Sequence, residues 1–111
     1  MKKVMVVTND SMVGESLSRV LRALENKVIL VDHNNALSSF LIEEPEVTFI
    51  LEYSEIGDKL EDYNIGRQTY QDIINSATEE QRIIRCGVED YSYPDYLKMP
   101  FVLDDIKKFL V

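Results

Sequence analysis

Residues 4–31, VMVVTNDSMVGESLSRVLRALENKVILV, contain the pattern that decides the fold. Val4–Val7 is a continuous apolar run of strand length, typical of a strand covered on both faces. Turn-forming residues follow, and Asp10 or Ser11 can cap the next helix. Val28–Val31 repeats the buried-strand pattern, so the stretch predicts a strand, a helix and a second strand. The apolar stripe of that helix has helical spacing and consists of Val13, Leu17, Val20, Leu21 and Leu24.

The middle of the chain continues this alternation. A short helix ended by Pro45 is predicted to bury its apolar residues, Leu37, Phe40 and Leu41. Val47–Leu51 predicts a third strand, and the acidic segment Glu52–Asp62 is predicted to be a solvated loop. A helix is expected from Gly66 to near Thr78. Its inner side would carry Tyr70, Ile73, Ile74 and Ala77.

Two short strands and a helix are predicted in the remaining sequence. Ile83 and Ile84 indicate the fourth strand, and Tyr96–Met99 the fifth, which Pro100 ends. The last helix is expected to bury Leu103, Ile106 and Leu110. Strands separated by helices predict one α/β domain over residues 1–111, a doubly wound parallel sheet of five strands with helices on both faces.

The connection between the fourth and fifth strands is unusually short. Eight residues separate Gly87 from Tyr96. A crossover between parallel strands ordinarily takes a dozen residues or more and usually contains a helix. The fourth crossover helix is therefore predicted to be missing or reduced to a turn.

Charge and composition exclude several classes of function. Twenty Asp and Glu against twelve Lys and Arg give a net charge of −8, which repels phosphate backbones and anionic lipid headgroups. We therefore expect no direct binding of nucleic acid or membranes. A single cysteine, Cys86, rules out an internal disulfide and fits a cytoplasmic protein. No glycine-rich phosphate loop follows the first strand, so no dinucleotide or P-loop site is predicted.

Three stretches together resemble a bacterial response-regulator receiver domain in place, order and spacing. They are the stretch quoted above, EPEVTFILEY at 44–53 and DYLKMPF at 95–101. The resemblance covers almost the whole chain. It implies the flavodoxin-like receiver topology and a role in two-component (phosphorelay) signal transduction.

The resemblance also identifies the positions that a working receiver needs. These are an acidic pair that holds Mg²⁺ after the first strand, and an Asp phosphoacceptor after the third. In this sequence the acidic pair falls on Thr8 and Asn9, with Asp10 beside them. The acceptor position falls on Leu51, or on Glu52 if the register slips by one. Glu52 is either a built-in negative charge that imitates the phosphorylated state or an exposed acid that starts the acidic loop.

Two further positions of the family also depart from its pattern. The Thr or Ser after the fourth strand is replaced by Cys86, whose thiol is a weak hydrogen-bonding group. The family's Lys directly before the Pro is replaced by Met99. Lys98 is displaced by one residue, which on a strand sends it to the opposite face. Together these departures predict a pseudo-receiver that is not an enzyme, performs no phosphotransfer and uses no metal or other cofactor.

Aromatic residues near the shortened connection are candidate contact residues. Tyr91, Tyr93, Tyr96 and Phe101 either form a contact surface or cover the sheet edge left by the missing helix. We expect a protein partner or a homodimer, and no small-molecule substrate. His33 is interpreted as a turn residue.

The predicted function is that of a noncatalytic receiver-like regulatory domain that acts by protein contact or dimerisation. It would stand alone or form the N-terminal domain of a transcriptional regulator. One alternative is a phosphorylatable receiver with an atypical acceptor, for which the nearest Asp is Asp58. Another is a flavodoxin-like module that binds a small molecule or nucleotide at the same strand ends.

Overall fold

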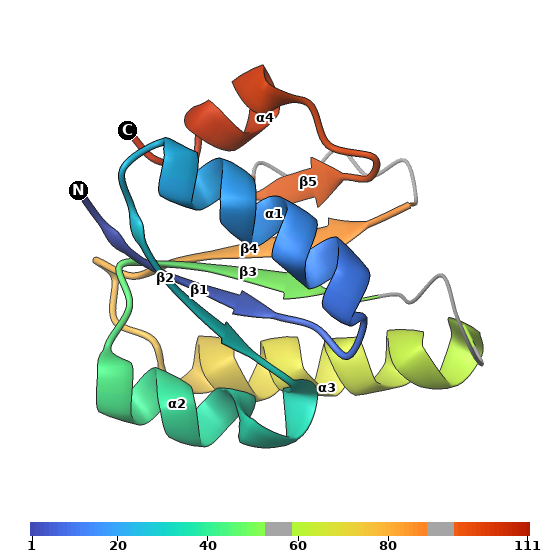
Figure 1. Cartoon of the computed structure of the whole chain (residues 1–111). Helices are drawn as coiled ribbons and strands as arrows, with labels where there is room; N and C mark the ends of the chain where they lie inside the picture. The colour runs from blue at the N-terminus through green and yellow to red at the C-terminus, as the bar shows by residue number, and fades with distance from the viewer. Residues whose placement is uncertain (53–58, 89–94) are drawn as a thin grey trace.

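A computed structural model describes residues 1–52, 59–88 and 95–111, with the side chains of 59–63 left out of the description (Figure 1). The strands are β1 (Lys3–Val7), β2 (Lys27–Val31), β3 (Val47–Leu51), β4 (Arg82–Gly87) and β5 (Tyr96–Lys98). The helices are α1 (Ser11–Ala23), the 3-10 turn η1 (His33–Asn35), α2 (Ala36–Glu43), α3 (Lys59–Ser76) and α4 (Leu103–Lys107).

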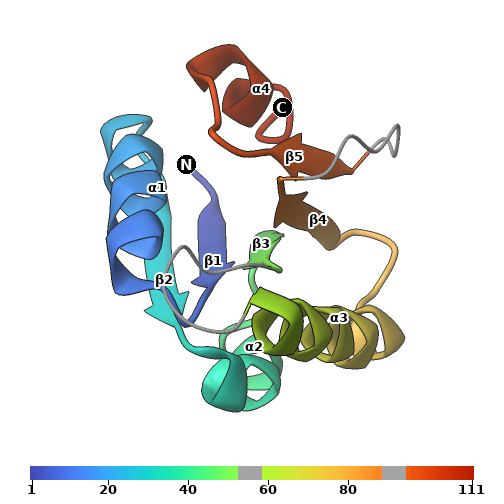
Figure 2. The same cartoon turned by 90° about the vertical axis from the view of Figure 1, so that its right-hand side faces the viewer.

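The strands form one parallel sheet in the order β2-β1-β3-β4-β5. Helices α1 and α4 lie on one face of the sheet, and α2 and α3 on the other (Figure 2). This arrangement confirms the predicted five-stranded, doubly wound parallel sheet. Because all strands run in the same direction, their carboxyl ends meet at one edge, where this architecture places its sites.

The central strands divide their side chains between two apolar layers. Val4 and Val6 of β1 pack toward α1 and α4, whereas Met5 and Val7 pack toward α2 and α3. All residues of β3 are buried. A strand covered on both faces has no solvated side, which explains why these segments read as unbroken apolar runs.

Of the two predicted caps, Asp10 is the cap of α1. Its carboxylate accepts hydrogen bonds from the backbone N–H groups of Met12 at 3.1 Å and Val13 at 3.2 Å. These N–H groups have no partner within the helix, so the cap stabilises its first turn. Leu17 and Leu21 then reach the core with their side chains fully buried.

In two short helices only some of the residues predicted to be buried are buried: Phe40 and Ile106 are confirmed. In α2 the buried side chains are Ala36 and Phe40, whereas Leu37 is 36% exposed and Leu41 58% exposed. Ala36 and Phe40 are the buried positions. Leu37 and Leu41 each follow one of them by one residue, so they are rotated by about 100° around the helix axis, away from the sheet. In the last helix Ile106 is buried, and Phe109 just after the helix is buried as well. Leu103 is exposed and Leu110 is only partly buried, although both were predicted to be buried.

The predicted acidic loop is wrong over residues 59–62. Helix α3 already begins at Lys59, and residues 53–58 lie outside the described part of the chain. Acidic residues are solvated on a helix surface as well as in a loop, so charge alone did not separate the two. The fourth strand is also longer than its two isoleucines indicated, because it includes Arg82 and Arg85.

β4 and β5 pair in parallel across the short connection, Arg85 being opposite Tyr96. Of the eight connecting residues, 89–94 lie outside the described residues. The hydroxyl of Tyr96 lies only 2.7 Å from where a Cβ on Gly87 would be, so the tyrosine ring packs over the glycine. Within the described ranges, no helix has the length and apolar character needed to cross a membrane.

Removing the α1 cap should weaken the fold measurably. We expect Asp10→Ala to lower the free energy of unfolding by about 1 kcal/mol, because two terminal N–H groups lose their acceptor. Urea unfolding followed by circular dichroism measures the change. Ser11→Ala is the control, since no capping bond from Ser11 accompanies that of Asp10. Equal losses in both variants would contradict the assigned cap.

Candidate functional site

The candidate site is the carboxyl-terminal edge of the sheet. After β1, Thr8 is buried and its hydroxyl accepts the backbone N–H of Asp10 at 2.9 Å. The amide oxygen of Asn9 accepts the backbone N–H of His33 at 3.0 Å. Asp10 caps α1. These polar atoms therefore organise the turn after β1 and attach it to η1.

Glu52, which follows β3, is 1% exposed and forms an ion pair with Arg85 of β4. The guanidinium contacts both carboxylate oxygens: Nε donates to Oε1, and Nη2 donates to Oε2 at 3.0 Å. Arg85 also lies over the ring of Tyr70 on α3, 5.2 Å from its centroid. Such a bidentate pair is the strong form of a charged hydrogen bond.

The interpretation of Glu52 as an exposed acid is wrong, and the sheet explains why. The N–H of Glu52 donates to the carbonyl of Cys86 at 2.9 Å, which extends the β3–β4 ladder by one residue. Leu51 packs toward α1 and α4. Strand alternation then directs Glu52 to the α3 side, where Arg85 also lies.

Helix α3 closes directly over Glu52. A Cβ added to Gly66 would lie 2.6 Å from Cα of Glu52, a distance shorter than any real contact. Only a residue without a side chain allows the helix to approach the strand so closely. Glu52 is therefore enclosed by Arg85 on one side and by the backbone of α3 on another.

His33 joins three elements at this edge, a role that its place in a turn did not reveal. It begins η1 as expected of a turn residue, but its ring is half-buried. Nδ1 lies 2.8 Å from the hydroxyl of Thr69 on α3, and Nε2 lies 3.1 Å from the carbonyl oxygen of Leu51. An imidazole has polar atoms on both sides, so one ring bridges α3 and β3.

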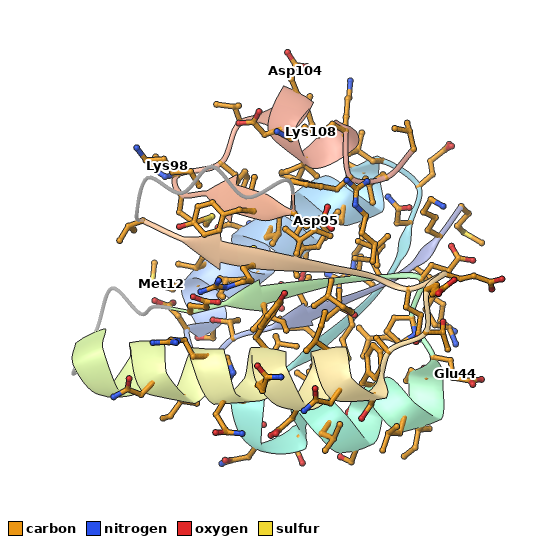
Figure 3. The ribbon with its side chains drawn as sticks, turned by 180° about the vertical axis from the view of Figure 1, so that it is seen from behind. Met12, Glu44, Asp95, Lys98, Asp104 and Lys108 are labelled. Carbon is orange, nitrogen blue, oxygen red and sulfur yellow. The ribbon has the colours of Figure 1, made fainter. Side chains whose placement is uncertain are left out.

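The positions on β4 and β5 hold residues of different character. Cys86 is fully buried in the α1 and α4 layer. Burial raises the pKa of its thiol well above the usual value, and the charge of Glu52 raises that pKa further. The thiol is therefore protonated at neutral pH. Met99 packs in the same layer, whereas Lys98 is exposed and points away from it (Figure 3).

The aromatic candidates divide into two groups. Tyr96 is 7% exposed, and Phe101 is partly buried against the α1 and α4 layer, so these two side chains help to cover the sheet. Tyr91 and Tyr93 lie outside the described residues, as does Asp58. The contact surface proposed for these tyrosines stays a prediction.

The described residues do not fit the Mg²⁺ ion that a working receiver holds. Mg²⁺ needs converging carboxylate oxygens in near-octahedral geometry. Asp10 directs its carboxylate to the α1 backbone, and Glu52 directs both oxygens to Arg85. Among residues that the structure describes, no group of three His, Cys, Asp or Glu side chains is arranged for a metal.

Comparison with known proteins identifies the fold. The sequence matches no protein-family model and no curated protein. Among solved structures, the CheY-like receiver domain from Methylobacillus flagellatus is similar, with a TM-score of 0.76 and 13% identity over 99% of this chain and 96% of that one. The chain has the receiver fold.

Other solved receivers superpose equally well. The signal receiver domain of a modulated diguanylate cyclase from Desulfovibrio desulfuricans has a TM-score of 0.74 and 14% identity over 99% of this chain and 90% of that one. The response regulator PhyR from Brucella abortus has a TM-score of 0.72 and 13% identity over 98% of this chain. This chain covers 46% of that PhyR chain, so the similarity concerns one part of a longer protein.

Replacing one partner of the buried ion pair should cost more stability than replacing both partners. We expect Glu52→Gln or Arg85→Gln alone to lower the free energy of unfolding by about 3–5 kcal/mol, because each leaves a buried charge without its partner. The double variant should lose less than the sum of the two single losses. Urea unfolding of all four proteins gives the coupling energy, and strict additivity would contradict a direct interaction.

Gly66 should resist substitution although it lies in a helix. Gly→Ala in an exposed helix stabilises by about 1 kcal/mol through helix propensity. Here we expect Gly66→Ala to destabilise by about 1–3 kcal/mol, because the new methyl group overlaps the backbone of Glu52. Asn64→Ala, an exposed position on the same helix, is the control and should be neutral or stabilising. Thermal unfolding compares the variants, and a more stable Gly66→Ala protein would refute the close contact.

Proposed function

We propose that this chain is a noncatalytic receiver-like regulatory domain of a two-component signalling protein, which acts by protein contact and independently of Asp phosphorylation. The observation that carries the proposal is the Glu52–Arg85 ion pair at the end of β3. Glu52 directly follows Leu51, and the resemblance to receivers puts the acceptor at one of these two positions.

The chemistry of phosphotransfer explains why this pair opposes catalysis. An acceptor carboxylate must reach phosphorus with a free oxygen, while a metal and cations neutralise the charge of the phosphoryl group. In this chain both oxygens of Glu52 accept from Arg85, and Gly66 closes the space above its Cα. Thr8 and Asn9, which replace the acidic pair, carry no charge.

The pair also gives Glu52 a structural role that involves no catalysis. Its carboxylate already has a cationic partner in Arg85, and Arg85 in turn contacts Tyr70, so the pair joins β3, β4 and α3. We infer that the domain presents a constant surface to its partner. Any regulation then comes from the partner or from attached domains.

The similar structures support a regulatory role. One is the receiver of a diguanylate cyclase, and another is PhyR, an anti-anti-sigma factor in Bartonella quintana. In the first of these proteins a receiver domain belongs to an enzyme. By analogy, the partner of this domain would be an output domain or regulator protein, including a transcriptional regulator.

The absence of phosphotransfer can be tested with Mg²⁺ and beryllofluoride, a mimic of the acyl phosphate. A ligand that binds only the folded state raises the melting temperature by mass action. We expect no rise at concentrations that saturate an ordinary receiver, because no acceptor and metal site are formed. Differential scanning fluorimetry measures the shift.

The control is a phosphorylatable receiver domain, measured in parallel, which must show the rise. A rise in this protein that Glu52→Gln abolishes would overturn the proposal and identify Glu52 as an acceptor. A rise that persists in Glu52→Gln would also overturn it and direct the search to the region around Asp58.

A further inference from the structure

Helix α2 carries apolar side chains on its outer side. Ala36 and Phe40 are buried against the sheet, whereas Leu37, Leu41 and Ile42 are 36%, 58% and 78% exposed. Leu37 and Leu41 are four residues apart and are therefore neighbours on the helix surface, and Ile42 follows directly. The helix lies at the border of the molecule beside α3, and no other element that the structure describes lies beyond it (Figures 1 and 2).

The same helix lies in the longest stretch of the sequence without a charged residue. Residues 33–42, HNNALSSFLI, include no Asp, Glu, Lys or Arg. In the whole chain 29% of the residues are charged and the net charge is −8. Two copies of so acidic a protein repel each other when charged surfaces meet. The outer side of α2 is a surface on which two copies can approach without opposing charges.

The sequence of α2 fits an antiparallel pairing with a second copy of itself. In a two-fold pairing centred at the height of Phe40, Ile42 of one copy lies opposite Ser38 of the other, so a large side chain meets a small one. The hydroxyl of Ser38 donates to the carbonyl of Asn35 at 3.1 Å. It therefore keeps its hydrogen bond when the contact excludes water.

The acidic end of α2 also favours the antiparallel orientation. Glu43 pairs with Lys3 at 3.6 Å, and Glu44, which follows it, is exposed. In an antiparallel pair each Glu44 lies toward the amino-terminal end of the other α2, where the helix dipole is positive. A parallel pair would bring the two Glu44 carboxylates together.

We propose that this protein forms a homodimer through the outer side of α2, with the two copies of the helix antiparallel about a two-fold axis. This inference rests on the proposed function, since it names the partner of the protein contact. Three apolar side chains from each copy bury little area. We therefore expect a weak dimer, with a dissociation constant of about 0.1 mM.

Analytical ultracentrifugation of the full chain, at concentrations up to about 0.5 mM, measures the dimer. The runs compare about 0.1 M with about 1 M NaCl, between which the Debye length falls from about 10 Å to about 3 Å. We expect the dimer to strengthen with salt, because screening reduces the repulsion between two acidic proteins and leaves an apolar contact intact. A monomer at both salt concentrations would overturn the proposal, and so would a dimer that salt weakens.

A charge placed on the outer side of α2 should prevent dimerisation. We expect Ile42→Glu to raise the dissociation constant by about thirtyfold, because a two-fold interface contains the change twice. The side chain is 78% exposed, so the variant should fold, which circular dichroism checks.

The matched control is Met12→Glu, which adds the same charge at another exposed apolar residue. Met12 of α1 is 73% exposed and lies on the opposite side of the molecule from Glu44 (Figure 3). The control should leave the dissociation constant nearly unchanged. Equal effects of the two variants, or a larger effect of Met12→Glu, would overturn the proposal.

The two proposals fail in different ways. A dimer that Ile42→Glu disrupts, together with a beryllofluoride-induced rise in melting temperature, overturns the noncatalytic function and supports the α2 contact. A monomer without such a rise overturns the α2 contact alone.

Discussion

The buried ion pair between Glu52 and Arg85 is the constraint on which the carboxyl-terminal edge of the sheet depends. A carboxylate with 2% of its side chain exposed is too costly to desolvate alone, so its partner must lie on the neighbouring strand at a matching register. The β3–β4 ladder provides that register by pairing Leu51 with Cys86, which places Glu52 within reach of Arg85. Tyr70 then fixes α3 against the pair.

Contacts at the same edge of the sheet also set the position of α3. Gly66 lets the helix backbone approach Cα of Glu52, and the ring of His33 connects Thr69 of the helix to the carbonyl of Leu51. Polar contacts in a largely apolar structure give little net stability but select one arrangement among several, because every alternative leaves buried polar groups unsatisfied. Here they hold the helix in a single register against β3.

The fold has the framework of a receiver, and its carboxyl-terminal edge carries the residues on which the proposed function rests. Capping of α1 by Asp10, continuous burial of β3 and parallel pairing of all strands supply the framework. At the edge, Thr8 and Asn9 carry no charge and Glu52 is paired with Arg85, and the proposed function rests on these residues. Eight residues connect β4 to β5, and 89–94 among them lie outside the described part of the chain. A polar groove between α3 and β4 has a described lining that includes Arg67 and Arg85.

The sequence by itself determined the order of strands and helices and the parallel sheet. Buried strands such as Val47–Leu51 and the α1 stripe leave periodic signals that do not depend on distant residues. It also placed the candidate edge residues on the correct strand ends. It could not place Glu52, Arg85 and Gly66 together, because they are far apart in sequence and only strand pairing and helix packing join them. The beginning of α3 at Lys59 and the exposure of Leu41 likewise depend on how the elements pack in the folded chain. Charged residues are solvated in both helices and loops, and a short helix is rotated by whatever it packs against.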